Sequence, residues 1–350
     1  MTTVKKTTIK DIARACDVSH ATVSRVLMGA DYPVSEKLRN RVRKAAEELR
    51  YTPNLIGRAL KTQQSNDVGI IVTNISNPAF VEMLINIEQN LSERSMCSFI
   101  ATLNRDPLKE KEILENFLSK QVRGIIFINT SSDQHTSSHH DILLKLCQSG
   151  VRIVVVDSLG GYTVPVSEVV IDYQKIGYIG TKHLLDIGRK RIAYLSAPLT
   201  KGSRLGMYKG YFETIYEFTD YFDPTYSFIS EDETEFATDN YELYNGSRLA
   251  KRLLETRPDT DAIFCCNDMT AIGAMAELKK HNVRIPQDIA VIGCDNILMS
   301  RMSAPTLSSI QNSPEEIGRT AVSLLLSESE HASRRVFLNP SLVIRESTGG

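Results

Sequence analysis

The amino-acid sequence predicts a small all-α domain at the N-terminus, followed by an α/β core of two doubly wound parallel-sheet lobes. The first observation is a charge asymmetry: residues 1–61 hold thirteen Lys/Arg against six Asp/Glu, a net charge of +7, and the rest holds 28 against 36, a net charge of −8. The second is helical periodicity within the basic segment, and the third is the alternation of short β-branched runs with longer helical stretches from Val68 onward. Neutralising the phosphates of a nucleic acid releases counterions, which favours binding. A basic segment joined to an acidic remainder therefore predicts that the N-terminal end binds a polyanion.

Three short helices account for the basic segment. Thr8 is the predicted N-cap of the first helix, with the acidic Asp11 three positions later. Ser19 and Ser35 are the predicted caps of the second and third helices. Residues predicted to be buried recur at helical spacing: Ile9, Ile12, Ala13 and Cys16 in the first helix, Val23, Val26 and Leu27 in the second, and Leu38, Val42, Ala45 and Leu49 in the third. Three helices with a tight first turn are typical of a helix-turn-helix, whose second helix lies in the major groove of DNA.

The segments 18–27 and 51–54 together carry a family resemblance. They read Val-Ser-His-Ala-Thr-Val-Ser-Arg-Val-Leu and Tyr-Thr-Pro-Asn, and at this separation they resemble the head of the LacI/GalR family of bacterial transcription regulators. Met28 departs from the pattern, which more often has asparagine there. The resemblance implies that His20, Ala21 and Arg25 read bases and that Thr22 and Ser24 hold phosphates, roles that their chemistry allows. The DNA-binding residues expected on this basis are Thr8, Ser19, His20, Ala21, Thr22, Ser24, Arg25, Asn54, Arg58 and Leu60.

Residues 54–61 resemble the family's hinge helix, and the polar residues that follow, up to 66, form a linker. A helix this short is marginal in water, because nucleation is costly. The resemblance implies that it folds when two copies meet over an operator, with Leu60 as a wedge in the minor groove. The expected domains are therefore a helix-turn-helix DNA-binding domain (1–53), the hinge helix and linker (54–66), and a two-lobed effector-binding and dimerisation domain (67–350).

The third domain is predicted from runs that are apolar on both faces, which indicate buried parallel strands. The predicted strands are residues 68–72, 98–101, 124–128, 152–156, 191–195, 262–266 and 289–293. About 285 residues exceed what one core usually supports, so two lobes are expected, with the ligand in the cleft between them. Segments such as 75–80, 122–126 and 285–296 also resemble the part of the LacI/GalR family that is related to periplasmic sugar-binding proteins.

Effector-binding residues are carried over from that resemblance. They are Phe80 and Phe236 as stacking faces, Asp157 and Asp172 for hydroxyl contacts, and Asn267 and Asp295 for bidentate polar contacts. The four polar residues are expected at or just beyond the carboxyl ends of strands, where open α/β sheets bind ligands, although such residues can also simply cap the next helix. Met207 stands where many members have an arginine, and Arg204 could supply that charge instead. Because a guanidinium recognises carboxylate and phosphate, an acidic or phosphorylated sugar remains open beside a neutral one.

Other chemistry is sparse in this sequence. The six cysteines form no Cys-x-x-Cys pair, and the pair His139-His140 reads as an exposed loop, so we expect neither a metal nor a cofactor. No Gly-x-Gly-x-x-Gly, Walker A or Gly-x-Ser-x-Gly motif occurs, which argues against an α/β enzyme. No signal peptide or bilayer-spanning stretch is found, which fits a cytoplasmic protein without a membrane partner and argues against an exported sugar-binding protein.

The sequence thus predicts a DNA-binding transcriptional regulator, most simply a repressor. Its expected partners are double-stranded palindromic operator DNA, a second copy of the chain as a homodimer, and a small-molecule effector, a carbohydrate by resemblance. Two alternatives stay open: control by a protein co-regulator, and activation in place of repression.

Overall fold

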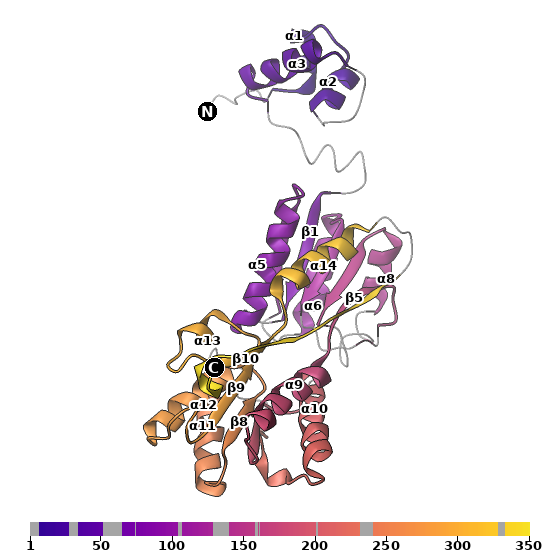
Figure 1. The fold of residues 1–350 in the computed structure, drawn as a ribbon. Helices are drawn as coiled ribbons and strands as arrows, with labels where there is room; N and C mark the ends of the chain where they lie inside the picture. The colour runs from indigo at the N-terminus through magenta and orange to yellow at the C-terminus, as the bar shows by residue number, and fades with distance from the viewer. Residues whose placement is uncertain are drawn as a thin grey trace, which may run out of the picture. The chain divides into compact units, whose positions relative to one another are not determined.

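The computed structural model describes residues 7–27, 34–51, 65–73, 75–103, 107–128, 140–157, 160, 162–200, 202–231, 241–327 and 333–350. The chain forms two compact units, Met1–Ser65 and Asn66–Gly350. The first contains the three helices α1–α3, and the second contains every strand of the described residues (Figure 1).

The first unit, here called the head, consists of α1 (Ile9–Ala15), α2 (His20–Leu27) and α3 (Glu36–Glu48). Its helices share a buried core of Ile12, Ala13, Cys16, Val23, Val26, Val42 and Ala46. The prediction that Leu49 is buried is wrong: α3 ends at Glu48, and the Leu49 side chain at its C-cap is 37% exposed. Ala46 takes the inward position instead.

The first lobe of the second unit is built on one parallel sheet in the order β11-β5-β4-β3-β1-β2. Its strands are β1 (Asp67–Val72), β2 (Cys97–Thr102), β3 (Gly124–Ile128), β4 (Arg152–Val156), β5 (Ser167–Ile171) and β11 (Arg335–Leu338). Helices α5 (Pro78–Ser92) and α14 (Pro314–Leu326) pack on one face, and α6 (Pro107–Ser119) and α8 (His140–Gln148) pack on the other. Residues of β3 alternate between the two cores because successive side chains of a strand point to opposite faces.

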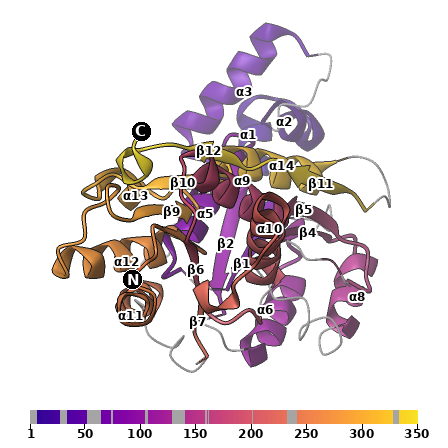
Figure 2. The same ribbon diagram turned by 60° about the horizontal axis from the view of Figure 1, so that its bottom comes forward.

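The second lobe has a sheet in the order β12-β10-β9-β8-β6-β7, parallel except for β12. Its strands are β6 (Ile192–Ser196), β7 (Ser227–Ile229), β8 (Ala262–Cys265), β9 (Ala290–Cys294), β10 (Ser308–Gln311) and β12 (Ser341–Val343). Its longer helices are α9 (Tyr173–Asp186), α10 (Gly202–Thr219), α11 (Tyr241–Thr256) and α12 (Asp268–Lys280), with the short α13 (Leu298–Met302), η1 (Pro224–Tyr226) and η3 (Glu346–Thr348). Helices α9 and α10 lie on one side of the sheet and α11 and α12 on the other (Figure 2).

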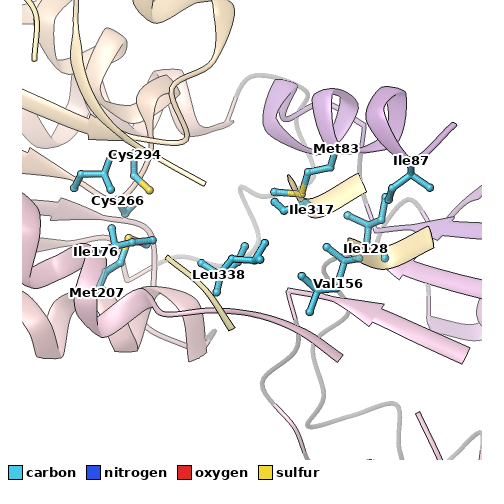
Figure 3. Close-up of a cluster of buried hydrophobic side chains, with 14 of the residues drawn as sticks. Met83, Ile87, Ile128, Val156, Ile176, Met207, Cys266, Cys294, Ile317 and Leu338 are labelled. Carbon is cyan, nitrogen blue, oxygen red and sulfur yellow. The ribbon is translucent and has the colours of Figure 1, made fainter. Parts of the chain in front are cut away.

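Three connections join the lobes: β5 to α9, β10 to α14, and β11 to β12. Each leaves the carboxyl end of a strand, so both sheets turn their carboxyl edges toward the boundary between the lobes. One apolar cluster has members in both lobes (Figure 3). In that view Met83 and Ile317 lie on one side, Met207 and Cys266 lie on the other, and Leu338 at the end of β11 lies between them.

Two glycines allow α9 and α10 to cross closely. A Cβ atom added at Gly177 would lie 2.1 Å from the Met207 carbonyl oxygen, and one added at Gly210 would lie 2.1 Å from the Gln174 carbonyl oxygen. Since neither backbone can give way without separating the helices, both positions require glycine. This close crossing holds α10 against α9 in the second lobe.

All seven predicted strands are present, with ends that agree to within one residue. The seven predicted strands do not include β5, β7, β10, β11 and β12. No helix in the described part of the chain combines the length and apolarity that crossing a bilayer requires.

Candidate DNA-binding head and ligand site

Helix α2 starts from a side-chain cap. The Ser19 hydroxyl oxygen accepts the Thr22 backbone N–H at 3.1 Å, and the two hydroxyl oxygens are 2.9 Å apart. Helix α1 starts differently, because the Thr8 backbone N–H and hydroxyl both donate to Asp11 Oδ2, at 2.9 and 2.7 Å. Ser35 caps α3 by accepting the Leu38 N–H at 3.3 Å, so all three predicted N-cap positions are confirmed.

The outward face of α2 presents the residues expected to read bases. Val23 and Val26 are buried in the head core, and His20, Ala21 and Arg25 are exposed. Thr22 and Ser24 are half-buried. The helix thus offers an imidazole, a methyl group and a guanidinium on one accessible surface, the combination that base-edge recognition uses.

Two basic residues missed by the sequence analysis lie beside that surface. Lys10 and Arg14, one turn apart on α1, line a shallow hollow together with Ser19 and His20. Both basic side chains are exposed. Their spacing of four residues on the polar face of α1 was the available signal. The expected residues Asn54, Arg58 and Leu60, together with Met28 and Phe236, lie outside the described residues.

The boundary between the lobes is crossed by a hydrogen bond. Asp157 follows β4 of the first lobe, is buried, and has a positive φ of 63°. The hydroxyl of Tyr173, the first residue of α9, donates to Asp157 Oδ1 at 2.6 Å. Burial and the nearby Asp157 charge raise the pKa of Tyr173 well above its usual value. The tyrosine therefore stays neutral and keeps its proton in this bond.

Asp295 occupies the corresponding position after β9 in the second lobe. It has a φ of 103°, and Asn296 has a φ of 54°. Asp268 supports this turn: Oδ2 accepts the Ile297 N–H at 2.9 Å, and Oδ1 accepts the Ser309 hydroxyl at 2.6 Å. Burial raises the pKa of Asp268 to about 7, and it raises the pKa of Asp295 well above its usual range.

Charges from both lobes act on Asp295. After burial, the carboxylates of Asp268, Glu242 and Asp157 contribute to its raised pKa. The structure therefore brings the predicted Asp157 and Asp295 together, and it adds Asp268 and Glu242, which the sequence analysis missed. Asp268 directly follows the predicted Asn267, but its complete burial depends on packing against β10 and α13.

Arg204 is already engaged. Its side chain is 7% exposed, lies 3.9 Å from Glu242 Oε1, and donates to the Pro198 carbonyl oxygen at 3.4 Å. Met207, at the position where an arginine was expected by resemblance, is buried in the apolar cluster. The guanidinium thus faces a carboxylate of its own lobe.

The other predicted ligand residues have structural partners as well. Asn267 caps α12 by accepting the Thr270 N–H at 2.8 Å, and the exposed Asp172 caps α9 by accepting the Lys175 N–H at 2.9 Å. Phe80, in the first turn of α5, is half-buried against the apolar cluster. Among the described residues no group of three or more His, Cys, Asp or Glu side chains is placed to hold a metal ion.

Comparison with known proteins agrees with this geometry. Residues 8–54 match the model of bacterial regulatory proteins of the lacI family, and residues 181–348 match that of the periplasmic binding protein-like domain. The HTH-type transcriptional repressor PurR of Mannheimia succiniciproducens is 32% identical over 344 residues, 97% of this chain and 98% of PurR. The chain belongs to the lacI family. It is a DNA-binding transcriptional repressor of that family and not an enzyme.

Solved structures show the same architecture for this lacI-family repressor. The complex of the transcriptional regulator CelR with cellobiose is 25% identical, with a TM-score of 0.68, and the match covers 98% of this chain and 100% of CelR. The lac repressor dimer bound to operator and the anti-inducer ONPF is 22% identical, with a TM-score of 0.78, and the match covers 98% of this chain and 99% of the lac repressor chain. The helical head and the two parallel-sheet lobes predicted from the sequence are thereby confirmed.

Proposed function

We propose that this repressor binds a palindromic operator as a homodimer and that a small hydroxylated ligand, a sugar or sugar derivative, controls its operator affinity from between the lobes. The observation that carries the proposal is the pairing of an outward-facing α2 with a cluster of buried polar groups at the carboxyl edges of both sheets. A ligand that contacts both lobes binds one arrangement of the lobes more tightly than another. The resulting difference in binding free energy couples the ligand to operator binding.

For the head, the proposal assigns base reading to His20, Ala21 and Arg25. Ser19, Thr22, Ser24 and Thr8 are proposed to contact the DNA backbone, joined by Lys10 and Arg14, which border the same hollow. Asn54, Arg58 and Leu60 complete the proposed set in the hinge. The proposed domain division is 1–53, 54–66 and 67–350, as expected from the sequence.

The effector site is proposed to consist of Phe80, Asp157, Asp172, Arg204, Phe236, Asn267 and Asp295. Among the described residues, Asp157, Asp295 and Glu242 present three carboxyl groups, and the Arg204 guanidinium already faces Glu242, so these groups favour a neutral ligand. Carboxyl oxygens accept hydrogen bonds from ligand hydroxyls and repel phosphate or carboxylate groups. The CelR complex holds cellobiose, a ligand of this class.

A homodimer is supported by an apolar surface that spans both lobes. Ile85 on α5 is 58% exposed, Met302 on α13 is 75% exposed, and the exposed Ile100 lies on β2, an edge strand without charged residues. The Leu298 N–H of α13 donates to Glu82 of α5 at 3.2 Å, so the two helices border one another. An uncharged edge strand beside exposed apolar side chains is typical of a surface that pairs with another chain.

DNA reading is tested with Arg25→Glu against a matched control, Arg43→Glu on α3. Both substitutions reverse one exposed head charge, and the loss that each causes on random duplex DNA measures its non-specific, electrostatic effect. On a duplex selected from a random library by the wild-type repressor, Arg25→Glu should cost at least about tenfold more affinity than Arg43→Glu, because a bidentate base contact contributes about 1–3 kcal/mol. Equal losses for the two variants would remove Arg25 from base reading.

The ligand is tested by thermal stabilisation against neutral sugars, sugar acids, sugar phosphates and purines, since a compound that binds only the native state raises apparent stability. A neutral sugar should stabilise the wild type, change its affinity for the selected duplex, and lose its effect in Asp157→Ala. Stabilisation by sugar phosphates or purines alone would overturn the proposed ligand class. No stabilisation by any compound would favour control by a protein co-regulator.

A further inference from the structure

A second cavity lies at the opposite edge of the second lobe. It has a volume of about 740 Å³ and is lined by the end of α9, the second half of α10, residues 221–226 and Arg257. Ile192, which lines it, is the first residue of β6, whereas the ligand site described above lies at the carboxyl ends of the strands. The cavity is therefore separate from that site, and its volume is within the range of small-molecule pockets, roughly 300–1,000 Å³.

Aromatic rings form much of the cavity wall. They are Tyr211, Phe218, Tyr221, Phe222 and Tyr226. Phe222 is held edge-on to Phe212, with ring centroids 4.8 Å apart, and edge-on to Tyr211 at 5.8 Å. The Tyr211 hydroxyl donates to the Ile192 carbonyl oxygen at 2.8 Å. These contacts fix the inner rings before any ligand binds.

The outer rings are left open to solvent. Tyr221 is 68% exposed and Phe218 is 47% exposed, although both line a concave surface. Aromatic side chains bury a large area and prefer stacked or edge-to-face neighbours. The Lys182 ammonium lies 5.0 Å from the centroid of the Phe218 ring, so the exposed Tyr221 ring and the remaining exposed surface of Phe218 are what the hollow offers to a planar ligand.

Among the described residues that line the cavity, the charge that is not balanced by an ion pair is positive. Arg257 is paired with Asp223 at 3.0 Å and stacks on Tyr226, 3.7 Å from the ring centroid. The other lining carboxylate, Asp186, is paired with Lys182. Arg191 lies 3.6 Å from Asp261.

Lys190 differs from these residues. Its backbone N–H donates to Asp261, but within the described residues its ammonium group makes no hydrogen bond or ion pair. It is exposed at the cavity, so its charge is available to an incoming anion. The neighbouring Arg189 donates to the Pro286 carbonyl oxygen and adds a second positive charge.

We propose that this cavity is a second ligand site, which binds a small planar aromatic anion: one ring system bearing a carboxylate, sulfonate or phosphate. The ring lies against Phe218, Tyr221 and Phe222, and the anionic group pairs with Lys190. The acidic ligand site between the lobes repels the same anion, so the two sites take ligands of different charge.

The test uses 1-anilinonaphthalene-8-sulfonate, an aromatic anion whose fluorescence rises on binding, titrated into the full-length protein. Lys190→Glu and Tyr221→Ser alter the proposed site. Lys251→Glu and Tyr244→Ser are matched controls on α11, since Lys251 is also exposed and Tyr244 is 67% exposed, as open as Tyr221. Each variant is compared with wild type by circular dichroism and thermal unfolding, so that a folding defect is recognised.

One saturable site per chain is expected. Lys190→Glu should weaken it by at least about tenfold, because an attraction becomes a repulsion, and Tyr221→Ser should weaken it by at least about threefold through the loss of ring contact. Both control variants should bind within about twofold of wild type. Absence of saturable binding, or equal effects of lining and control variants, would overturn the proposal. Unchanged binding in both lining variants would also overturn it, since the dye would then occupy another surface.

Discussion

Asp268→Asn tests how a buried carboxyl group makes the stability of the second lobe depend on pH. Asp268 is completely buried, and its pKa is about 7 in the folded protein against 3.8 ordinarily. Between these values the unfolded chain releases the proton that the folded protein keeps. The free energy of unfolding therefore falls as pH rises from about 4 to about 7, and stays constant above that. At 1.36 kcal/mol per pKa unit, the full change is of the order of 4 kcal/mol.

The measurement is urea unfolding of wild type and Asp268→Asn at several pH values from about 4 to about 8. Asparagine does not titrate, so the variant lacks this pH-dependent decrease. It is less stable than wild type at low pH, by about 1–3 kcal/mol, because its amide NH₂ cannot accept the hydrogen bond that one Asp268 oxygen now accepts. As pH rises, the difference should shrink and then reverse, because the roughly 4 kcal/mol that the wild type loses exceeds the 1–3 kcal/mol deficit of the variant.

A second titrating group acts in the same range and must be separated from Asp268. Burial lowers the pKa of His183 below its usual 6.5, so its contribution to stability is lost as pH falls below that value, the opposite direction. Because His183 is present in both proteins, it cancels in the difference. The Asp295 carboxyl does not cancel fully, since the Asp268 charge helps to raise its pKa, and it changes the difference with pH in the same direction as Asp268. A wild-type-minus-variant difference that does not change with pH would refute the argument, since Asp268 would then be ionised throughout, held by the N–H and O–H groups that donate to it.

Three further substitutions test other parts of the structure. Ser19→Ala removes the cap of α2 and should destabilise that helix by about 1 kcal/mol. The measurement is hydrogen exchange of the first-turn amides of α2, which should become faster. Unchanged exchange would mean that the cap contributes nothing. Gly177→Ala places a methyl group 2.1 Å from a carbonyl oxygen, whereas Gly206→Ala on α10 meets its nearest atom at 3.0 Å. Urea unfolding should show a loss of about 1–3 kcal/mol for the first and a clearly smaller loss for the second, and equal losses would contradict the close helix crossing. Glu277 has its pKa lowered to about 2, first by the Lys280 hydrogen bond. Glu277→Gln should therefore be less stable than wild type by roughly 1 kcal/mol near neutral pH. This loss of stability should disappear as pH falls from about 4.5 to about 2, where Glu277 becomes protonated. A loss that persists at the lowest pH would exclude the ion pair as its cause.

The parts of the fold that were predictable are those encoded by local pattern. The strands β1, β3 and β4 are continuous apolar runs, buried on both faces, and their positions followed from the sequence directly. Strand β11 reads Arg-Val-Phe-Leu with only Leu338 buried, and it pairs with β5, far away along the chain. Its place depends on a partner that local composition does not specify. The three crossings between the lobes escaped prediction for the same reason.

The candidate ligand site also has a part that was predictable from the sequence and a part that was not. The sequence correctly predicted that Asp157, Asn267 and Asp295 follow strands, which are β4, β8 and β9. It could not identify Glu242, because this residue begins a helix and approaches Asp295 only through the packing of the second lobe. Nor could it show that Arg204, which could otherwise bind an anion, is paired with that same Glu242.

The backbone gives an independent reason to place the ligand site at this edge. Asp157 and Asp295 both have positive φ values, 63° and 103°, each directly after a buried strand. Such conformations are uncommon outside glycine, and the other described non-glycine residues that have them, apart from Asn296, lie within three residues of a helix C-terminus, where they are ordinary. Here Asp268 holds the Asp295 turn through the Ile297 N–H. Glycine at either position would relieve the strain and remove the carboxyl group. Two aspartates in positive-φ turns that directly follow strands, one in each lobe, favour a bound ligand over simple helix capping.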